Sequence, residues 1–438
     1  MRVRRRMASL ALVVAAVLTV SAGCAATSEP EAESAGTLDL VQVPGDADTL
    51  AQASGLVAPG GVIEIGEGVW AEQLLVSTPD VTVRGVDRNE TIIDGEGLRP
   101  YGVVGIADGV RIENLTVTGA TFYGVLVTGL HDEAGPAAHG AGAYEPFDPE
   151  AFPPLQRFAI EGVTAHNNGL YGIYAFNAQH GVIRESYASG SADSGFYVGQ
   201  CETCNILVER NVAERNAVGF ENANASGLTV VGNRFSDNRV GMTFLSNYVE
   251  AFSPQRDNEV AGNLVSDNVS TDSPSQADGG FGIGIGVSGG VDDLFVNNRV
   301  TGNPRAGVLI SNTEDLATIG LSVQQTDFAE NGVDIANVSA DRAPATGTCV
   351  SGSFSALPEA LQDAALACSD TPDPAASSAD LPHVEAPPGV SFLQVAAPTD
   401  QPQFSSNAGM LPAEIEMPDA STYPVPATDF LADRTGTR

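Results

Sequence analysis

The stretch ILVERNVAERNAVGFENAN, residues 206–224, is followed by LTVVGNRFSDNRVGMTFLS, residues 228–246, in the same frame. In each copy two Asn lie five residues apart, as Asn211 and Asn216 do, and a Gly then precedes an apolar run. The frame returns as EVAGNLVSDN at 259–268 and as LFVNNRVTGNPRAGVLISN at 294–312. Self-similarity at a fixed period is the signature of a repeat protein, so the chain is built from one stacked unit.

The glycines that precede the apolar runs define the period. Most lie 22 to 25 residues apart, and two longer steps of 48 and 41 residues indicate insertions. They are Gly124, Gly172, Gly195, Gly219, Gly241, Gly282 and Gly307. A unit of this length with short β-branched runs predicts one coil of a parallel β-helix. Asn amides at the turns can hydrogen-bond from coil to coil, and Asn tolerates the left-handed backbone expected there.

Residues 43–76 (VPGDADTLAQASGLVAPGGVIEIGEGVWAEQLLV) resemble the entry of right-handed β-helix proteins. In those proteins a short helix caps the first coil and a strand of the form Gly-Gly-x-Ile-x-Ile follows. The body, over residues 40–345, resembles the pectate-lyase-like superfamily with PbH1-type repeats. The resemblance implies an all-β fold, a single-stranded right-handed parallel β-helix of about ten coils with a short N-terminal capping helix. It does not fix the activity, because one fold hosts many functions.

The N-terminus predicts export. Four Arg within the first six residues precede the apolar run 10–20, which is too short to span a bilayer, so residues 1–23 are typical of a signal peptide. Ser21-Ala22-Gly23-Cys24 resembles a bacterial lipobox, which implies a lipid on Cys24, a tether over residues 24–39 and an extracytoplasmic protein anchored to the cell membrane. Ordinary cleavage near Ala22 or Ala25, giving a free secreted protein, is the alternative.

Charge narrows the choice of partner. The chain has 55 acidic residues against 20 basic ones, all of them Arg, and a net charge of −35. Loss of residues 1–23 leaves 16 Arg and a net charge of −39. A surface of this kind excludes nucleic acid as a partner and favours neutral over acidic polysaccharides, since uronates would be repelled. We expect a monomer.

Four further cysteines lie in the predicted exported part, where disulfides are the default. Cys349 and Cys368 would close a cap over residues 346–370, in which 354–367 is typical of a short amphipathic helix. Cys201 and Cys204 fit a small disulfide loop, with a redox pair or half a metal site as alternatives.

The tail over residues 371–438 shows no repeat and is rich in proline. Eleven of the 26 Pro of the chain lie in its last 68 residues. We expect an extended segment that either stays mobile or lies along the β-helix. Phe392, Leu393 and Ile415 are the residues that could dock it.

Strand alternation places one set of side chains outward, between the insertions near residues 130–157 and 245–257. We expect these insertions to flank an open trough. Rings stack on pyranose faces and amides bond to hydroxyl groups, so the set suits sugar binding. The alternative is an ordinary solvated surface. The predicted substrate-binding residues are Tyr174, Tyr197, Asn177, Gln200 and Asn224.

Glu221 and Asp193 fall on neighbouring coils and are the candidate catalytic carboxyl groups. Hydrolysis of a glycosidic bond needs two such groups about 5–9.5 Å apart. If the chain is an enzyme, it is a glycoside hydrolase or a polysaccharide lyase. We predict no cofactor and no metal site, although exposed carboxylates could bind Ca²⁺.

These features favour a cell-envelope lipoprotein that binds, and as an enzyme would process, an extracellular or cell-wall polysaccharide. A non-enzymatic envelope scaffold or adhesin is the first alternative. An accessory protein for maturation of an extracytoplasmic metalloenzyme is the second.

Overall fold

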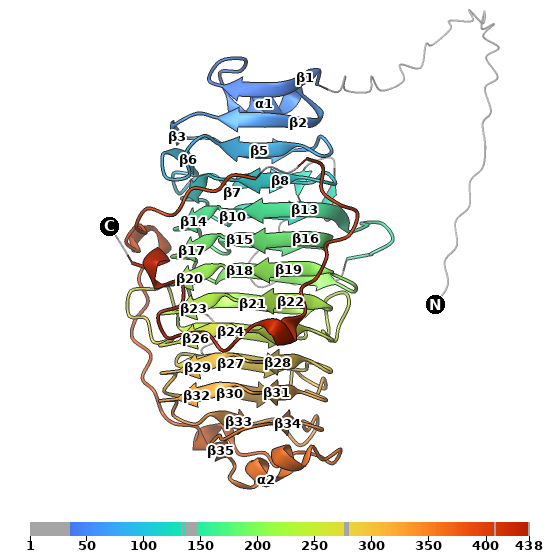
Figure 1. The fold of residues 1–438 in the computed structure, drawn as a ribbon, viewed down its shortest axis with the longest axis vertical. Helices are drawn as coiled ribbons and strands as arrows, with labels where there is room; N and C mark the ends of the chain where they lie inside the picture. Colours follow the sequence, from blue (N-terminus) through green and yellow to red (C-terminus); the bar gives the residue numbers. More distant parts are fainter. Residues whose placement is uncertain (1–35, 133–134, 137–146, 276–279, 407–408, 437–438) are drawn as a thin grey trace, which may run out of the picture. The chain divides into compact units, whose positions relative to one another are not determined.

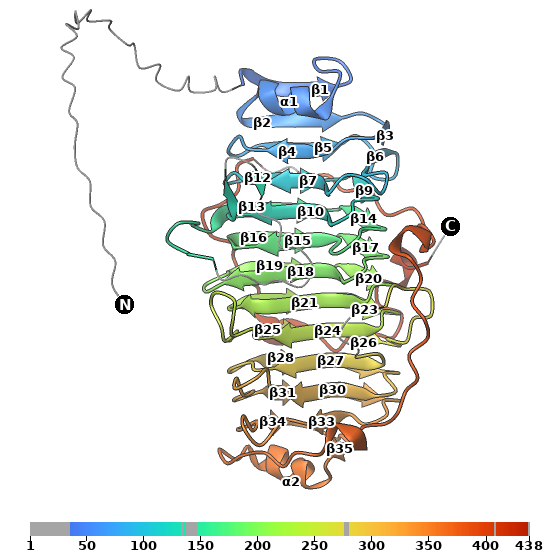
Figure 2. The same cartoon turned by 180° about the vertical axis from the view of Figure 1, so that it is seen from behind.

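The repeated apolar runs form strands that pair in parallel with the equivalent strands of the next coil (Figures 1 and 2). The computed structural model describes residues 36–132, 135–136, 147–275, 280–406 and 409–436. Three sheets of 12, 10 and 11 strands, called A, B and C, follow one another around each coil. Each of the ten strands of sheet B belongs to one complete coil, which confirms the expected number of coils.

The strands are short, with bounds as follows. Sheet A contains β1 (Leu38–Val43), β2 (Val57–Ile65), β5 (Thr82–Gly85), β8 (Arg111–Glu113), β13 (Leu155–Glu161), β16 (Ala178–Arg184), β19 (Ile206–Glu209), β22 (Leu228–Val231), β25 (Glu259–Ala261), β28 (Leu294–Val296), β31 (Ser322–Gln324) and β34 (Cys349–Val350). Sheet B contains β3 (Gly68–Trp70), β6 (Thr91–Asp94), β9 (Thr116–Thr118), β14 (Thr164–His166), β17 (Tyr187–Ser189), β20 (Val212–Glu214), β23 (Arg234–Ser236), β26 (Leu264–Ser266), β29 (Arg299–Thr301) and β32 (Asp327–Ala329). Sheet C contains β4 (Leu74–Val76), β7 (Tyr101–Gly105), β10 (Tyr123–Thr128), β15 (Ile173–Phe176), β18 (Ser194–Cys201), β21 (Val218–Ala225), β24 (Val240–Leu245), β27 (Ile283–Ser288), β30 (Ala306–Ser311), β33 (Ile335–Asn337) and β35 (Ala356–Leu357). The pair β11 (His131–Asp132) and β12 (Gly135–Pro136) is a separate antiparallel ladder.

A short helix covers each end of the stack. Helix α1 (Leu50–Leu56) begins after Thr49, whose side chain accepts a hydrogen bond from the Gln52 N–H, and it buries Leu50 against the first coil. Helix α2 (Ala360–Ala367) contacts β34 and β35 at the other end. Both helices cover sheet edges that would otherwise expose unpaired backbone groups. No helix of the described residues is long and apolar enough to cross a membrane.

The interior is filled by the inward-facing side chains of all three sheets, and the longer strands contribute two or three each. On sheet C the residue after each repeated glycine faces inward, and Phe196, Phe220 and Met242 are fully buried there. The assignment of Gly282 to this series was wrong by two residues. Ile285 pairs with Val308 and lies in the core, so Gly284 is the repeated glycine. An insertion precedes β27, so counting residues from the previous coil could not show which of the two glycines is the repeated one.

Two columns of asparagines connect the coils at their turns. Between sheets A and B, the Nδ2 of Asn211 donates to Asn233 (3.0 Å), and the column continues through Asn263 to Asn298. A second column between sheets B and C starts at Asn216. Contrary to expectation, the left-handed backbone belongs to the residue before each ladder asparagine, such as Arg210 at φ +53°. The ladder side chains can therefore point inward and stack.

The same ladder explains the repeated glycines. A Cβ added at Gly219 would lie 2.5 Å from the Gly241 carbonyl oxygen and 2.9 Å from the Asn238 amide nitrogen. Such contacts are too close for any side chain, so the position admits only glycine.

The tail, residues 371–436, lies along the β-helix over its described length. In Figure 1 it runs orange to red up one edge and then crosses in front of the strands of sheet A. Its helical turns are η1 (Ser378–Asp380), η2 (Phe392–Gln394), η3 (Ala420–Thr422) and η4 (Ala432–Arg434). Of the expected docking residues, Ile415 packs against the outer face of sheet A, the Phe392 carbonyl accepts a hydrogen bond from Asn167, and Leu393 stays 53% exposed.

Apolar contacts hold the middle of the tail. Leu411 and Ala420 are buried against outward-facing apolar side chains of sheet A. These side chains form two neighbouring columns, one of Ala159, Val182 and Leu207 and one of Val231, Ala261 and Val296. Removing this surface from water stabilises the docked tail.

Two buried arginines hold the tail on either side of this apolar segment, one at Pro402 and one at Arg434. Arg88, on the β-helix, is 1% exposed and donates to the carbonyl oxygens of Pro402 (3.0 Å) and Val163 (3.0 Å). Arg434, in the tail, is 3% exposed and donates to the carbonyl oxygens of Arg210 (2.7 Å) and Ser186 (3.0 Å). Burial lowers the pKa of Arg88 well below its usual value, and the nearby Arg434 cation lowers it further.

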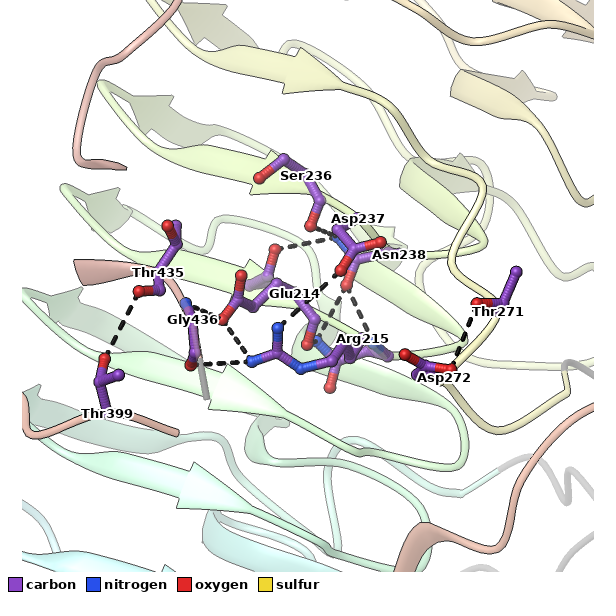
Figure 3. Close-up of polar contacts among 12 residues, drawn as sticks. Glu214, Arg215, Ser236, Asp237, Asn238, Thr271, Asp272, Thr399, Thr435 and Gly436 are labelled. Atoms are coloured by element: carbon purple, nitrogen blue, oxygen red, sulfur yellow. Dashed lines mark hydrogen bonds and ion pairs between the residues drawn. The ribbon is translucent and has the colours of Figure 1, made fainter. Parts of the chain in front are cut away.

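The last described residue is also held from both sides (Figure 3). The Gly436 N–H donates to Glu214 (2.8 Å), and Arg215 donates to the Gly436 carbonyl oxygen (3.1 Å). Tyr187 donates to the same Glu214 oxygen (2.6 Å), so the side chains that hold Gly436 are anchored in sheet B.

Loss of the Arg434 contacts should release the tail. In Arg434→Ala, buried carbonyl oxygens lose a charged donor, which costs about 1–3 kcal/mol per unsatisfied group. We expect faster amide hydrogen exchange and faster proteolysis over residues 396–436, with the coils unaffected. The control is Arg256→Ala, which removes an exposed arginine. Unchanged amide hydrogen exchange over residues 396–436 in Arg434→Ala would contradict the role given to Arg434.

Candidate functional site

One outward-facing column on sheet C carries the predicted site. Tyr174 pairs with Tyr197, Tyr197 with Glu221, and Glu221 with Thr243. These partners lie on successive rungs about 4.8 Å apart. The structure thus brings Tyr174, Tyr197 and Glu221 together, as strand alternation predicts.

The tyrosines form a packed aromatic cluster on this face. Ring centroids lie 4.6 Å apart for Tyr171 and Tyr197, and 4.7 Å apart for Tyr174 with both Tyr197 and Tyr123. Tyr174 is only 4% exposed and Tyr197 2%. The expectation of an open, solvent-facing floor was therefore wrong, because neighbouring rings cover one another.

The two insertions meet above this cluster. Phe147, from the first insertion, contacts Phe252 of the second with ring centroids 6.2 Å apart, and it contacts Phe176 of sheet C at 5.9 Å. Phe152 also packs against the cluster. The insertions were expected to stand apart as walls, but their described parts close over the sheet.

The candidate carboxyl groups share one hydroxyl group. Ser194 donates to Glu221 Oε2, and its Oγ lies 3.3 Å from Asp193 Oδ1. Asp193 is half-buried at the end of the turn, and Glu221 is 8% exposed. Asp193 and Glu221 therefore come together from neighbouring coils, as the sequence predicted, and the serine bridges them.

Tyr171 belongs to this site and was missed by the sequence reasoning. Burial raises the pKa of its hydroxyl well above the usual value, and the charges of Asp193 and Glu221 raise it further. Tyr171 therefore stays a neutral hydrogen-bond donor beside two carboxyl groups. Its position directly before the repeated Gly172 was the signal that could have found it.

The three predicted amides at the edge of sheet C are turn residues. Asn177, Gln200 and Asn224 have φ of +48°, +53° and +52° and are almost fully buried, so they do not face solvent as expected. Asn177 donates to the Phe152 carbonyl oxygen (2.9 Å), and Asn224 donates to that of Asn247 (2.8 Å). Two of these amides thus hold the insertions against the sheet.

Glu250, in the second insertion, is a further residue that the sequence reasoning missed. It is 6% exposed, its Oε1 accepts a hydrogen bond from Asn247 Nδ2 (3.2 Å), and the Gln200 side chain also bonds to its carboxyl group. Burial raises the pKa of Glu250 to about 7, against the opposing effect of the Gln200 and Asn247 amides. Near neutral pH this carboxyl group can hold or release a proton.

Both expected disulfides form. Cys201 joins Cys204, and Cys349 joins Cys368 beside the C-terminal helix. In the described parts of the chain no three His, Cys, Asp or Glu side chains gather as metal ligands would. Cys24, the predicted lipidation site, lies outside the described residues.

Comparison with known proteins agrees with this architecture. Residues 156–328 match the family model described as a right handed beta helix region. The body of this chain is a right-handed parallel β-helix. No curated protein matches the sequence.

Several solved structures share the β-helix. The A-module of the mannuronan C-5 epimerase AlgE6 of Azotobacter vinelandii is 16% identical, with a TM-score of 0.48, over 68% of this chain and 80% of that chain. Pectate lyase Pel9A is 16% identical, with a TM-score of 0.44, over 87% of this chain and 97% of that chain. The Dettilon tailspike protein is 12% identical, with a TM-score of 0.47, over 71% and 61%. At these identities the likeness concerns the fold alone.

Burial of Glu250 should make stability depend on pH. The pKa of Glu250 rises from 4.5 to about 7 on folding, so the folded state keeps the proton up to a higher pH than the unfolded state does. The free energy of unfolding therefore falls as pH rises from 4.5 to 7. Glu250→Gln removes this cost and should raise the free energy of unfolding at pH 8 by at most about 3 kcal/mol. Near pH 4 the gain should vanish.

Urea unfolding at pH 4, 6 and 8 measures this effect. Glu202→Gln, at an exposed position of the same turn edge, is the matched control and should show no such trend. A gain of the same size at every pH would contradict the burial argument.

Proposed function

We propose that this protein binds an extracellular or cell-wall polysaccharide on the outer face of sheet C and acts on it with Asp193 and Glu221. The observation that carries the proposal is the carboxyl pair bridged by Ser194 next to a tyrosine cluster. Aromatic rings supply apolar contact to a sugar ring, and two carboxyl groups supply the acid and base of glycosidic hydrolysis.

The charges at the site favour a neutral polymer. Asp193, Glu221 and Glu250 all lie on or beside this face, and the chain carries a large acidic excess. A uronate would be repelled here unless Ca²⁺ bridged the like charges. Neutral glycans meet no such barrier.

The proposal includes the location of the protein. The signal-peptide pattern of residues 1–23 and the lipobox-like Cys24 support an extracytoplasmic protein anchored to the bacterial cell membrane by a lipid. Such a tether would hold the β-helix near wall polymers. Loss of the membrane fraction in Cys24→Ala would test it.

A non-enzymatic scaffold is the second candidate, and one observation favours it. Sheet A is covered by the tail, and the tyrosines of sheet C are covered by the insertions. A body closed in this way is a rigid spacer.

Calorimetry decides between polysaccharide binding and the scaffold. The probes are neutral hexasaccharides of the glucose, mannose and N-acetylglucosamine series, with hexagalacturonate as the anionic comparison. At least one neutral probe should bind. Tyr197→Phe and Glu221→Gln should each weaken it about tenfold, a loss of about 1.4 kcal/mol. Product release, followed with and without Ca²⁺, should stop in Glu221→Gln.

Tyr248→Ala is the matched control. Tyr248 is 62% exposed on the second insertion and lies outside the aromatic cluster, so binding should not change. Absence of binding to every probe would favour the scaffold, and binding that survives in Glu221→Gln and Tyr197→Phe would place the site elsewhere.

A further inference from the structure

A cavity of about 280 Å³ lies where the second insertion meets the turns that lead from sheet C to sheet A. Glu202 follows β18 and Ser226 follows β21, and the other lining residues belong to the insertion. The full lining is Glu202, Ser226, Phe252, Ser253, Pro254 and Arg256. Sites for drug-sized ligands have volumes of about 300–1,000 Å³, so this cavity suits a small molecule.

Two opposite charges line this cavity without neutralising each other. Most arginines of the described chain form ion pairs, as Arg157 does with Asp80 (2.7 Å). Within the described residues, neither Arg256 nor Glu202 takes part in an ion pair or a side-chain hydrogen bond. Both side chains are exposed, so a ligand in the cavity can reach them. The cavity therefore presents one cation and one anion that the fold leaves without a countercharge.

A hydroxyl group in the same wall also lacks a partner. Ser253 Oγ is buried and forms no hydrogen bond with any described residue. Buried polar groups are nearly always hydrogen-bonded, so each exception needs an explanation. A serine side chain moves between staggered positions by rotation about one bond, which lets this hydroxyl group turn to a ligand.

The insertion supplies the apolar part of the wall. Phe252 has a φ of +63°, a conformation that bulky residues rarely adopt. Such strain persists only where the surroundings impose it, and it gathers at ligand sites. The Phe252 ring contacts Phe147 of the first insertion, with centroids 6.2 Å apart, and lines the cavity together with Pro254. Two separated charges thus border an apolar surface.

We propose that this cavity binds a small zwitterion, an α-amino acid with an apolar side chain. The carboxylate of the ligand binds the Arg256 guanidinium group, whose parallel N–H donors match its two oxygens. The ammonium group of the ligand donates to the Glu202 carboxylate. The apolar side chain packs on Phe252, and Ser253 adds a hydroxyl group.

Other ligand classes match these groups less well. A divalent cation needs several oxygen ligands and would meet the charge of Arg256. An anion such as phosphate would meet the charge of Glu202, and a neutral sugar would leave both charges without a countercharge. A zwitterion satisfies both charges at once.

This site is separate from the carboxyl pair on sheet C. Asp193 directly precedes β18 and Glu202 directly follows it. The eight residues of this strand span roughly 26 Å. The proposed amino-acid site therefore goes beyond polysaccharide binding and does not depend on it.

Calorimetry with leucine and phenylalanine, each in its L and D form, tests the proposal. For phenylalanine the matched probes are 3-phenylpropionate, which lacks the amino group, and 2-phenylethylamine, which lacks the carboxyl group. For leucine they are 4-methylpentanoate and 3-methylbutylamine. Wild type should bind at least one free amino acid, and its two matched probes about tenfold more weakly, a loss of about 1.4 kcal/mol each.

Charge-removing variants show which group binds which end of the ligand. Glu202→Gln and Arg256→Gln should each bind the amino acid about tenfold more weakly than wild type. Glu202→Gln should bind the probe without an amino group no more weakly than wild type does, and Arg256→Gln likewise the probe without a carboxyl group. The charge-matched controls are Glu259→Gln on β25 and Arg305→Gln before β30, and neither should change binding.

Several outcomes would overturn the amino-acid site. They are no binding of any free amino acid, binding that survives in both variants, and an equal loss for all three probes, which would mean a general structural effect. Binding of a neutral hexasaccharide that falls in Arg256→Gln would assign the cavity to a sugar instead. Glu221→Gln should leave amino-acid binding unchanged, so failure of the polysaccharide proposal and failure of this one are separate results.

Discussion

The hydrogen bonds that pass from coil to coil through stacked asparagines hold the rest of the structure in register. Each ladder amide accepts from the backbone N–H of the previous coil and donates to the next side chain, as Asn238 does between Asn216 and Asn268. Because these groups are buried, a slip by one residue would leave several of them unpaired at once. The ladder therefore fixes which side chains share a column, including Tyr174, Tyr197 and Glu221.

The few cations of this acidic chain serve the fold. Arg88 and Arg434 are buried and donate to carbonyl oxygens that join the tail to the β-helix. Arg111 pairs with buried Glu161 (2.6 Å), and Arg215 holds the chain end. Arginine suits these places because its planar group can satisfy several acceptors while buried. Such pairing leaves an acidic surface, which favours a neutral partner for the site on sheet C.

The two covered faces of the β-helix differ in how they are closed. On sheet A, aliphatic side chains of the tail pack on outward-facing aliphatic side chains, and buried arginines hold the tail on either side of this contact. On sheet C, tyrosines lie beside a carboxyl pair, and Glu250 of the second insertion lies beside Gln200 at the edge. The first contact removes apolar surface from water and so stabilises the docked tail. The second face holds titratable groups whose pKa is shifted by burial, and such groups commonly mark functional sites.

The sequence alone determined the repeat, the class of fold, the number of coils, the disulfide pairs and the neighbourhood of Asp193 and Glu221. These features follow from local periodicity, because a residue one period away is also one rung away. Only the tertiary structure decided which outward columns are covered. Phe147, Phe252 and the tail reach those columns from distant parts of the chain, so no local pattern could show that Tyr197 is buried or that Glu250 lies beside Gln200. The shift from Gly282 to Gly284 has the same origin, since an irregular insertion breaks the count on which the periodicity depends.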